Sequence, residues 1–289
     1  MNFSKKYLPY FLIIILFLST IFVWHFVVYG KNQTDYLTVA FLDVGQGDAI
    51  FIEAPNGKQM LVDGGPDGKV LQQLGEIMPF GDRSIDVVVA THPDLDHIGG
   101  LSFVLDNYNI SYLVDNGIIG ETEAYRELQN EISKNKINKV VAKEGMRIFL
   151  DQSENIYFDI LYPDRDVSTF ESNDSSIVGR LVYKDKSFML TGDASVYTEN
   201  IIKWNESKED LNSQILKLGH HGAKTSSSIL WLEDVSPEIA IVSAGRNNRY
   251  NHPSQEVLER LDSLNIPYLE TSKEGNIIFK TDGLVLMKE

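Results

Sequence analysis

Four side chains that can bind a metal ion occupy six consecutive positions of the chain: His92, Asp94, Asp96 and His97. They directly follow the short segment Asp86–Ala90, which predicts a buried strand. A tight loop that enters a helix can aim all four side chains at one point, whereas a single regular helix or strand cannot. Imidazole and carboxylate ligands together suit zinc or manganese. A solvated acidic loop that caps a helix is the alternative interpretation, and two histidines bracketing two aspartates disfavour it.

The histidines of the chain gather in loops. There are six, and His25 lies in an apolar N-terminal stretch, whereas the other five follow predicted strands in loops rich in glycine or asparagine, namely His92, His97, His220, His221 and His252. Because the chain has no cysteine, a metal would need histidine, aspartate, glutamate or asparagine as ligands. Asp193 ends the turn Thr191-Gly192-Asp193. Without the other candidate ligands in the chain, it would be interpreted as an ordinary helix cap.

The composition of the 289 residues is acidic, with a formal net charge of −15 and a pI near 4.8. This balance argues against a broad basic surface that would grip nucleic acid through its phosphates. It leaves a phosphodiester substrate possible, because bound divalent cations can invert the potential inside an acidic cleft.

The first thirty residues differ from the rest. Two lysines precede a nearly unbroken apolar stretch over residues 7–29, which at about 1.5 Å per residue is long enough to span a bilayer core. We expect a cytoplasmic tail over residues 1–6 and a single-pass transmembrane anchor over 7–29, with the remainder extracellular, because lysines favour the cytoplasmic side. A cleaved signal peptide is the alternative, although no small-x-small cleavage site closes the stretch.

The remainder, residues 36–289, is expected to form one domain, because no repeat, low-complexity tract or Pro/Gly-rich linker divides it. Strands come first, followed by strands that alternate with helices, and this order predicts an α+β fold of two sheets packed face to face with helices outside. The predicted strands cover 37–44, 49–53, 59–62, 86–90, 177–184, 187–190, 214–218, 238–242, 277–279 and 284–287. The predicted helices cover 69–77, 101–107, 122–134, 196–204 and 253–264.

The segment Thr91–Gly100 resembles the signature loop of the metallo-β-lactamase superfamily, in the variant where Asp94 replaces the second histidine. More narrowly, Tyr36–Glu289 resembles the extracellular hydrolase domain of ComEC-type DNA-uptake proteins. The other segments that carry this resemblance, in matching order, are Phe41–Ala49, Leu61–Gly65, Leu190–Asp193, His220–Gly222 and Asn248–Pro253. The resemblance implies a four-layer αββα sandwich and a site for two divalent metal ions, zinc or manganese.

Six residues match the family's metal ligands. The resemblance implies that the first cation is held by His92 and Asp94, the second by Asp96, His97 and His221, and that Asp193 bridges the two. His220 is the competing choice for the position given to His221.

Three further positions bear on this site. Asp63 matches an aspartate that orients the loop at His92 in the family. Asn173 stands where many members have a metal-binding histidine, so the third ligand of the first cation is open. The segment Gly45–Asp48 lacks the lysine and helix of a phosphate-binding loop, and we interpret it as a tight turn whose Gln46 and Asp48 brace the floor of the site.

The implied reaction is hydrolysis of a phosphodiester. Two cations held ~3.5–4 Å apart can generate a bridging hydroxide nucleophile at neutral pH. Asp96 and Asp193 would orient this nucleophile, and His252 would protonate the leaving oxygen.

Three functions remain open on this basis. The leading one is a membrane-anchored extracellular nuclease or phosphodiesterase that acts on DNA, and the second is an esterase of a cell-envelope phosphodiester such as phosphorylcholine on teichoic acid. The third, from another class, is a non-catalytic anchored binding module. A β-lactamase activity rests on the superfamily name alone. The membrane is an expected partner through the N-terminal helix, and no protein partner is implied.

Overall fold

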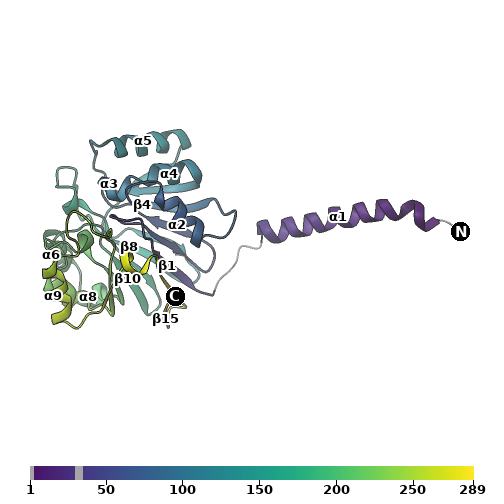
Figure 1. Cartoon of the computed structure of the whole chain (residues 1–289). Coiled ribbons are helices and arrows are strands. Elements are labelled where there is room, and N and C mark those ends of the chain that lie inside the picture. Colours follow the sequence, from purple (N-terminus) through teal and green to yellow (C-terminus); the bar gives the residue numbers. More distant parts are fainter. Residues whose placement is uncertain (1–2, 30–34) are drawn as a thin grey trace.

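The computed structural model describes the backbone of residues 3–29 and 35–289. Helix α1 (Phe3–Tyr29) covers the apolar N-terminal stretch, and Figure 1 shows it apart from the other elements. Within the described residues, no helix combines the length and the apolar character that crossing a membrane requires. This finding does not support the predicted transmembrane anchor over residues 7–29.

Two β-sheets form the centre of the domain (Figure 1). The first has the strand order β15-β14-β1-β2-β3-β4-β5-β6, and the second has the order β13-β12-β11-β10-β9-β8-β7. The first sheet comprises β1 (Leu37–Phe41), β2 (Ile50–Glu53), β3 (Gln59–Val62), β4 (Ser84–Ala90), β5 (Asn109–Asp115), β6 (Asn138–Val141), β14 (Ile277–Thr281) and β15 (Leu286–Lys288). The second comprises β7 (Arg147–Asp151), β8 (Ile156–Tyr162), β9 (Val178–Tyr183), β10 (Lys186–Leu190), β11 (Ile215–Lys217), β12 (Ile239–Val242) and β13 (Tyr268–Glu270).

Helices cover the outer face of each sheet (Figure 1). Those on the first sheet are α2 (Lys69–Ile77), α3 (Leu95–Ile98), α4 (Leu101–Asn107) and α5 (Glu123–Asn135). The second half of the chain contributes α6 (Val196–Asn205), α7 (Lys208–Leu211), α8 (Ile229–Val235), α9 (Gln255–Ser263) and α10 (Thr271–Glu274). The predicted two-sheet sandwich with outer helices is therefore confirmed.

Alternation along the strands divides the apolar side chains among three cores. Val39 and Phe41 of β1 point into the core between the two sheets, whereas Ala40 and Leu42 join the core beneath the helices of the first sheet. A third core lies between the second sheet and its own helices, and Trp231 belongs to it. Central strands such as β1 and β12 are covered on both faces and are therefore almost continuously apolar.

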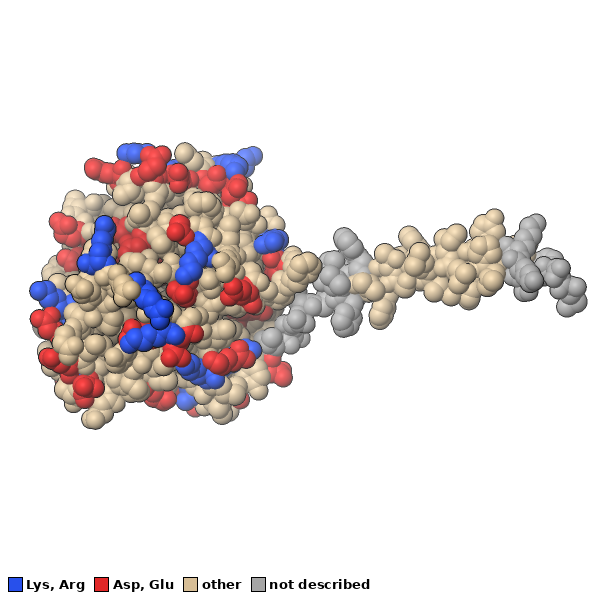
Figure 2. Space-filling model, viewed as in Figure 1, with Lys and Arg blue, Asp and Glu red and all other residues tan. Residues whose placement is uncertain are grey.

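Parallel pairing aligns the strand ends that matter for chemistry. Strand β3 pairs in parallel with β4 in the first sheet, and β10, β11 and β12 are parallel neighbours in the second. Neighbouring parallel strands end at the same edge of a sheet, so the loops that follow them lie close together. Figure 2 shows scattered groups of acidic side chains on the visible face of the domain, with basic side chains between them.

Candidate metal centre

Four strand ends deliver the candidate ligands to one edge of the sandwich. Asp63 follows β3, and His92 follows β4, from which the chain turns directly into α3. Asp193 follows β10, whereas His220 and His221 follow β11 in a short 3-10 turn. Both of these histidines have positive φ angles of 48° and 55°, a backbone conformation that non-glycine residues rarely adopt and that recurs at functional sites.

Asp63 organises the loop that carries the first histidines. It adopts a φ of 59° and accepts hydrogen bonds from the Thr91 backbone N–H (2.8 Å) and hydroxyl (2.7 Å). Its Oδ2 also lies 2.8 Å from His97 Nδ1. This contact places a proton on His97 Nδ1 and directs Nε2 at the centre of the site. Asp63 thus orients the loop at His92, as the family resemblance implies.

The other two buried histidines are held in the same manner. The Thr91 hydroxyl donates to Asp63, so it can accept from His92 Nδ1, which lies 3.0 Å away. His221 Nδ1 donates to the carbonyl oxygen of Ser243 at 2.8 Å. The Nε2 atoms of His92, His97 and His221 therefore all face the centre of the site, and all three are buried without a hydrogen-bond partner among the described residues.

These three nitrogens converge on the carboxylate of Asp193. Its Oδ1 lies 3.2 Å from His97 Nε2, and its Oδ2 lies 3.4 Å from His221 Nε2 and 4.0 Å from His92 Nε2. A buried cluster in which imidazole nitrogens face carboxylate oxygens needs positive charge at the nitrogens, which protons on His97 and His221 or a bound divalent cation can supply. Imidazole nitrogen and carboxylate oxygen are also the ligand types that zinc and manganese take. The residues present therefore fit a divalent metal centre.

The remaining predicted ligands lie around this cluster. Asp94 Oδ2 is 3.7 Å from His92 Nε2, while its other oxygen accepts a hydrogen bond from Ser172 at 2.5 Å. Asp96 Oδ2 is 3.3 Å from His221 Nε2. Gly47 makes this packing possible, because a Cβ at its position would lie 2.1 Å from the Asp96 carbonyl oxygen.

His220 and Asn173 occupy the region where the family's third histidine is missing. The Asn173 amide nitrogen lies 3.3 Å from His220 Nδ1, and His220 Nε2 lies 3.8 Å from Asp193 Oδ2. Both His220 and His221 thus approach Asp193. Both rings lie near Asp193 Oδ2, but His221 is buried and lies closer, whereas the His220 side chain is 29% exposed.

His252 lies at the outer rim of the cluster. Its ring centroid is 5.4 Å from that of His220 and 6.4 Å from that of His221. Burial and the neighbouring His220 lower the pKa of His252 to about 4. Its imidazole is therefore neutral at pH 7 and can accept a hydrogen bond from a substrate.

Carboxylates dominate the electrostatics of the centre. Burial alone would lower the pKa of His97, but Asp193 and Asp63 outweigh this effect and raise the pKa well above its ordinary value. The same competition between burial and Asp193 raises the pKa of His221 to about 9. For Asp193, the attraction of His221 and His97 outweighs burial and holds its pKa well below the usual range. The field at the converging nitrogens therefore favours positive charge.

Two charged residues beneath the ligands complete the floor. Ligand atoms of Asp48, His97, Asp193 and His221 lie within 4.8 Å of one another. The Asp48 carboxylate forms an ion pair with the ammonium of Lys217, which is fully buried. Lys217 also donates to the Gly192 carbonyl oxygen at 2.9 Å. Because Lys217 already neutralises Asp48, we interpret that carboxylate as a support for the His221 ring, whose Nδ1 lies 3.4 Å away.

Sequence reasoning missed Lys217. The only signal was a lysine inside the otherwise apolar run Ile215–Leu218, a position where a charged side chain must find a buried partner.

Comparison with known proteins agrees with this geometry. A family model described as the metallo-beta-lactamase superfamily matches residues 42–246. ComE operon protein 3 of Bacillus subtilis is 30% identical over 260 residues, which cover 84% of this chain and 33% of that protein. Recombination protein 2 of Haemophilus influenzae is 32% identical over 242 residues, which cover 82% of this chain and 28% of that protein. The chain thus spans about a third of the length of these relatives.

Among solved structures, Igni18, described as a novel metallo hydrolase of Ignicoccus hospitalis, superposes with a TM-score of 0.57 at 14% identity. The superposition covers 85% of this chain and 99% of that one. At this identity the similarity concerns the fold, and it agrees with the two-sheet sandwich.

Proposed function

The chain belongs to the metallo-beta-lactamase superfamily, and from this premise we propose that it is a metal-dependent phosphodiesterase that acts on nucleic acid. One observation carries the catalytic part of the proposal. Three buried imidazole Nε2 atoms, of His92, His97 and His221, face the carboxylate of Asp193 with no hydrogen-bond partner among the described residues.

We assign the cations to the ligands that the family resemblance implies. His92 and Asp94 would hold one, Asp96, His97 and His221 the other, and Asp193 would bridge them. His220 is a further nitrogen ligand close to Asp193, available where Asn173 replaces the family's histidine. Bound divalent cations would acidify a water molecule and offset the charge that develops on the phosphate.

The chain's own residues would place the reactants. Asp96 and Asp193, whose Oδ2 atoms lie 3.3 and 3.4 Å from His221 Nε2, can accept hydrogen bonds from the attacking water and fix its direction. His252 at the rim would contact the departing group. Its low pKa supports a role as a hydrogen-bonding contact in the free protein, in place of the proton donor that the sequence suggested.

The substrate is inferred from the relatives. One of them is named Recombination protein 2, and recombination is a process that acts on DNA. A second substrate class, a single phosphodiester of the cell envelope, is favoured by the net charge of −15, which offers no general attraction to a polyanion. The membrane attachment and the extracellular location stay predictions.

We expect the purified chain to hydrolyse bis-p-nitrophenyl phosphate and a single-stranded oligonucleotide when Mn²⁺ or Zn²⁺ is supplied, and to lose both activities in EDTA. The assay compares these substrates with p-nitrophenylphosphorylcholine at equal metal concentration. A strong preference for the phosphorylcholine ester would indicate that the substrate is a cell-envelope phosphodiester and not nucleic acid. Absence of hydrolysis of all three with either metal would contradict the enzymatic function.

A further inference from the structure

A pocket of about 410 Å³ opens beside the metal centre. It shares Asp96 with the centre, and its lining residues are Gln46, Pro66, Leu95, Asp96, Asn248, Arg249 and Tyr250. Since Asp96 Oδ2 lies 3.3 Å from His221 Nε2, a substrate held at the metal centre would extend directly into this pocket.

The loop that forms one wall is fixed by the side chain of Asn248. Its Oδ1 accepts hydrogen bonds from the backbone N–H groups of Tyr250 (3.2 Å) and His252 (3.0 Å). Its Nδ2 donates to the carbonyl oxygens of Gly245 (3.0 Å) and His252 (2.6 Å). Four hydrogen bonds from one side chain hold the loop in a single shape, so the side chains it carries are positioned before a ligand arrives.

Arg249 and Tyr250 form a layered cationic wall. The guanidinium carbon of Arg249 lies 4.7 Å from the centroid of the Tyr250 ring, and the guanidinium donates to the Tyr250 hydroxyl. On the inner side, the Tyr250 ring lies 5.7 Å from the His252 ring at an interplanar angle of 23°. In the part of the chain that the structure describes, no carboxylate forms an ion pair with Arg249, so its charge is available to a ligand.

Gln46 adds a donor at the floor of the pocket. Its amide oxygen accepts from the Gly245 N–H at 3.2 Å, which fixes the side chain. Its amide nitrogen is buried and has no hydrogen-bond partner among the described residues. A buried donor without a partner is costly, and an oxygen of a bound anion would satisfy it.

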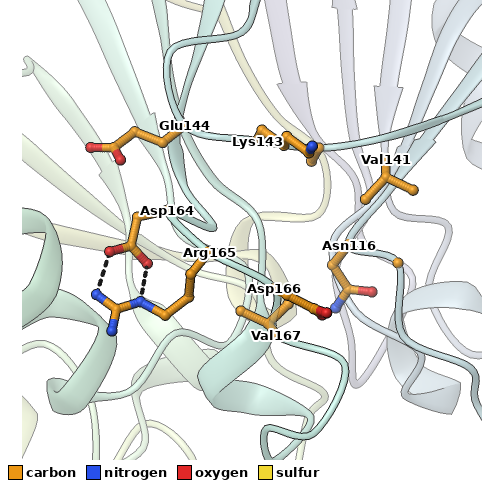
Figure 3. A pocket seen from close by; sticks show the side chains of 10 residues that line it. Asn116, Val141, Lys143, Glu144, Asp164, Arg165, Asp166 and Val167 are labelled. Carbon is orange, nitrogen blue, oxygen red and sulfur yellow. Dashed lines mark hydrogen bonds and ion pairs between the residues drawn. The ribbon is translucent and has the colours of Figure 1, made fainter.

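A second pocket of about 590 Å³ (Figure 3) has, among the described residues that line it, no buried donor without a hydrogen-bond partner. Its charged lining residues are Lys143, Glu144, Asp164, Arg165 and Asp166, so three carboxylates oppose two cations. Arg165 is already engaged by Asp164 at 2.6 Å. Of the two pockets, the one beside Asp96 is therefore the better site for an anion.

We propose that this pocket binds a second phosphate of a polymeric substrate, next along the strand from the phosphodiester held at the metal centre. Arg249 would bind its oxygens through a planar, bidentate contact. The apolar wall formed by Leu95 and Pro66 and the ring of Tyr250 would contact the sugar or base between the two phosphates. This inference rests on the proposed phosphodiesterase function and deepens it, because a substrate with a single phosphate could not use the pocket.

The test compares Arg249→Ala with Arg246→Ala in the full chain. Arg246 is exposed on the same loop and does not line the pocket. Its replacement therefore removes one positive charge from the loop but leaves the proposed phosphate contact in place. The readout is the preference of each variant, the ratio of kcat/KM for a single-stranded oligonucleotide to that for bis-p-nitrophenyl phosphate with Mn²⁺.

We expect Arg249→Ala to lower this preference by roughly tenfold or more, mainly through the KM for the oligonucleotide, as loss of a charge-assisted contact implies. Arg246→Ala should leave it within about twofold of the unsubstituted chain. Equal preferences in all three proteins, or equal losses in both variants, would overturn the second-phosphate site while leaving the phosphodiesterase intact. If the unsubstituted chain cleaves neither substrate, the proposed function itself fails.

Discussion

Replacing Asp193 by asparagine is expected to reduce hydrolysis of bis-p-nitrophenyl phosphate by roughly a thousandfold or more. The carboxylate lies between His97 Nε2 at 3.2 Å and His221 Nε2 at 3.4 Å, with one oxygen near each ring. An amide keeps the shape of the side chain but removes the negative charge that binds the cations. Because a divalent cation contributes several kcal/mol of transition-state stabilisation, and about 1.4 kcal/mol corresponds to tenfold in rate, the loss should be of this size.

The measurement is kcat/KM of Asp193→Asn with saturating Mn²⁺ and with saturating Zn²⁺. Asp262→Asn, at an exposed position near the end of α9, is the matched control and should retain full activity. Far-ultraviolet circular dichroism of both variants distinguishes lost chemistry from lost folding. Activity within tenfold of the unsubstituted chain would refute the bridging role of Asp193.

Replacing Lys217 by methionine is expected to lower the free energy of unfolding by about 3–5 kcal/mol. Its side chain is 0% exposed, its ammonium pairs with Asp48, and it donates to the Gly192 carbonyl oxygen at 2.9 Å. Methionine fills the space but leaves the Asp48 carboxylate buried without its cation, and a charge stranded in the interior costs more than the ion pair itself contributes.

Urea unfolding of the full chain measures this effect. Lys58→Met is the control, because the Lys58–Asp86 pair is on the surface and its loss should cost under about 1 kcal/mol. The double variant Lys217→Met, Asp48→Asn should recover part of the loss, since it removes the stranded charge as well. If Lys217→Met and Lys58→Met proved equally stable, the buried pair would have no structural role.

The fold could be predicted because its signals are local. The helices over 69–77 and 101–107 occur with the predicted bounds, and β3 matches residues 59–62. Strands β5 to β8 were not predicted. Strand β5 (Asn109–Asp115) mixes polar and apolar residues, and its pairing with β4 is parallel, so no turn next to it in the sequence reveals the partner.

In the site, too, the residues that are neighbours in sequence could be predicted from their spacing, and those brought together only by folding could not. His92, Asp94, Asp96 and His97 are neighbours in sequence, so their spacing alone indicated a metal-binding loop. Lys217 is a single charged residue whose partner lies 169 positions earlier, at Asp48, and only the packing of the two sheets brings them together.

The N-terminal stretch is a different case. Composition predicted a transmembrane anchor over residues 7–29, and a sliding count of apolar residues cannot by itself establish a membrane span. In the residues that the structure describes, no helix meets the requirement.

The metal content of the purified chain tests the central claim most directly. The chain is saturated with Mn²⁺ or Zn²⁺, freed of loose ions by gel filtration, and analysed by inductively coupled plasma mass spectrometry beside Asp193→Asn. Convergence of three free imidazole nitrogens on one carboxylate predicts two equivalents per chain, and a substantial loss in the variant. No bound metal in the unsubstituted chain, or equal amounts in both proteins, would contradict the account.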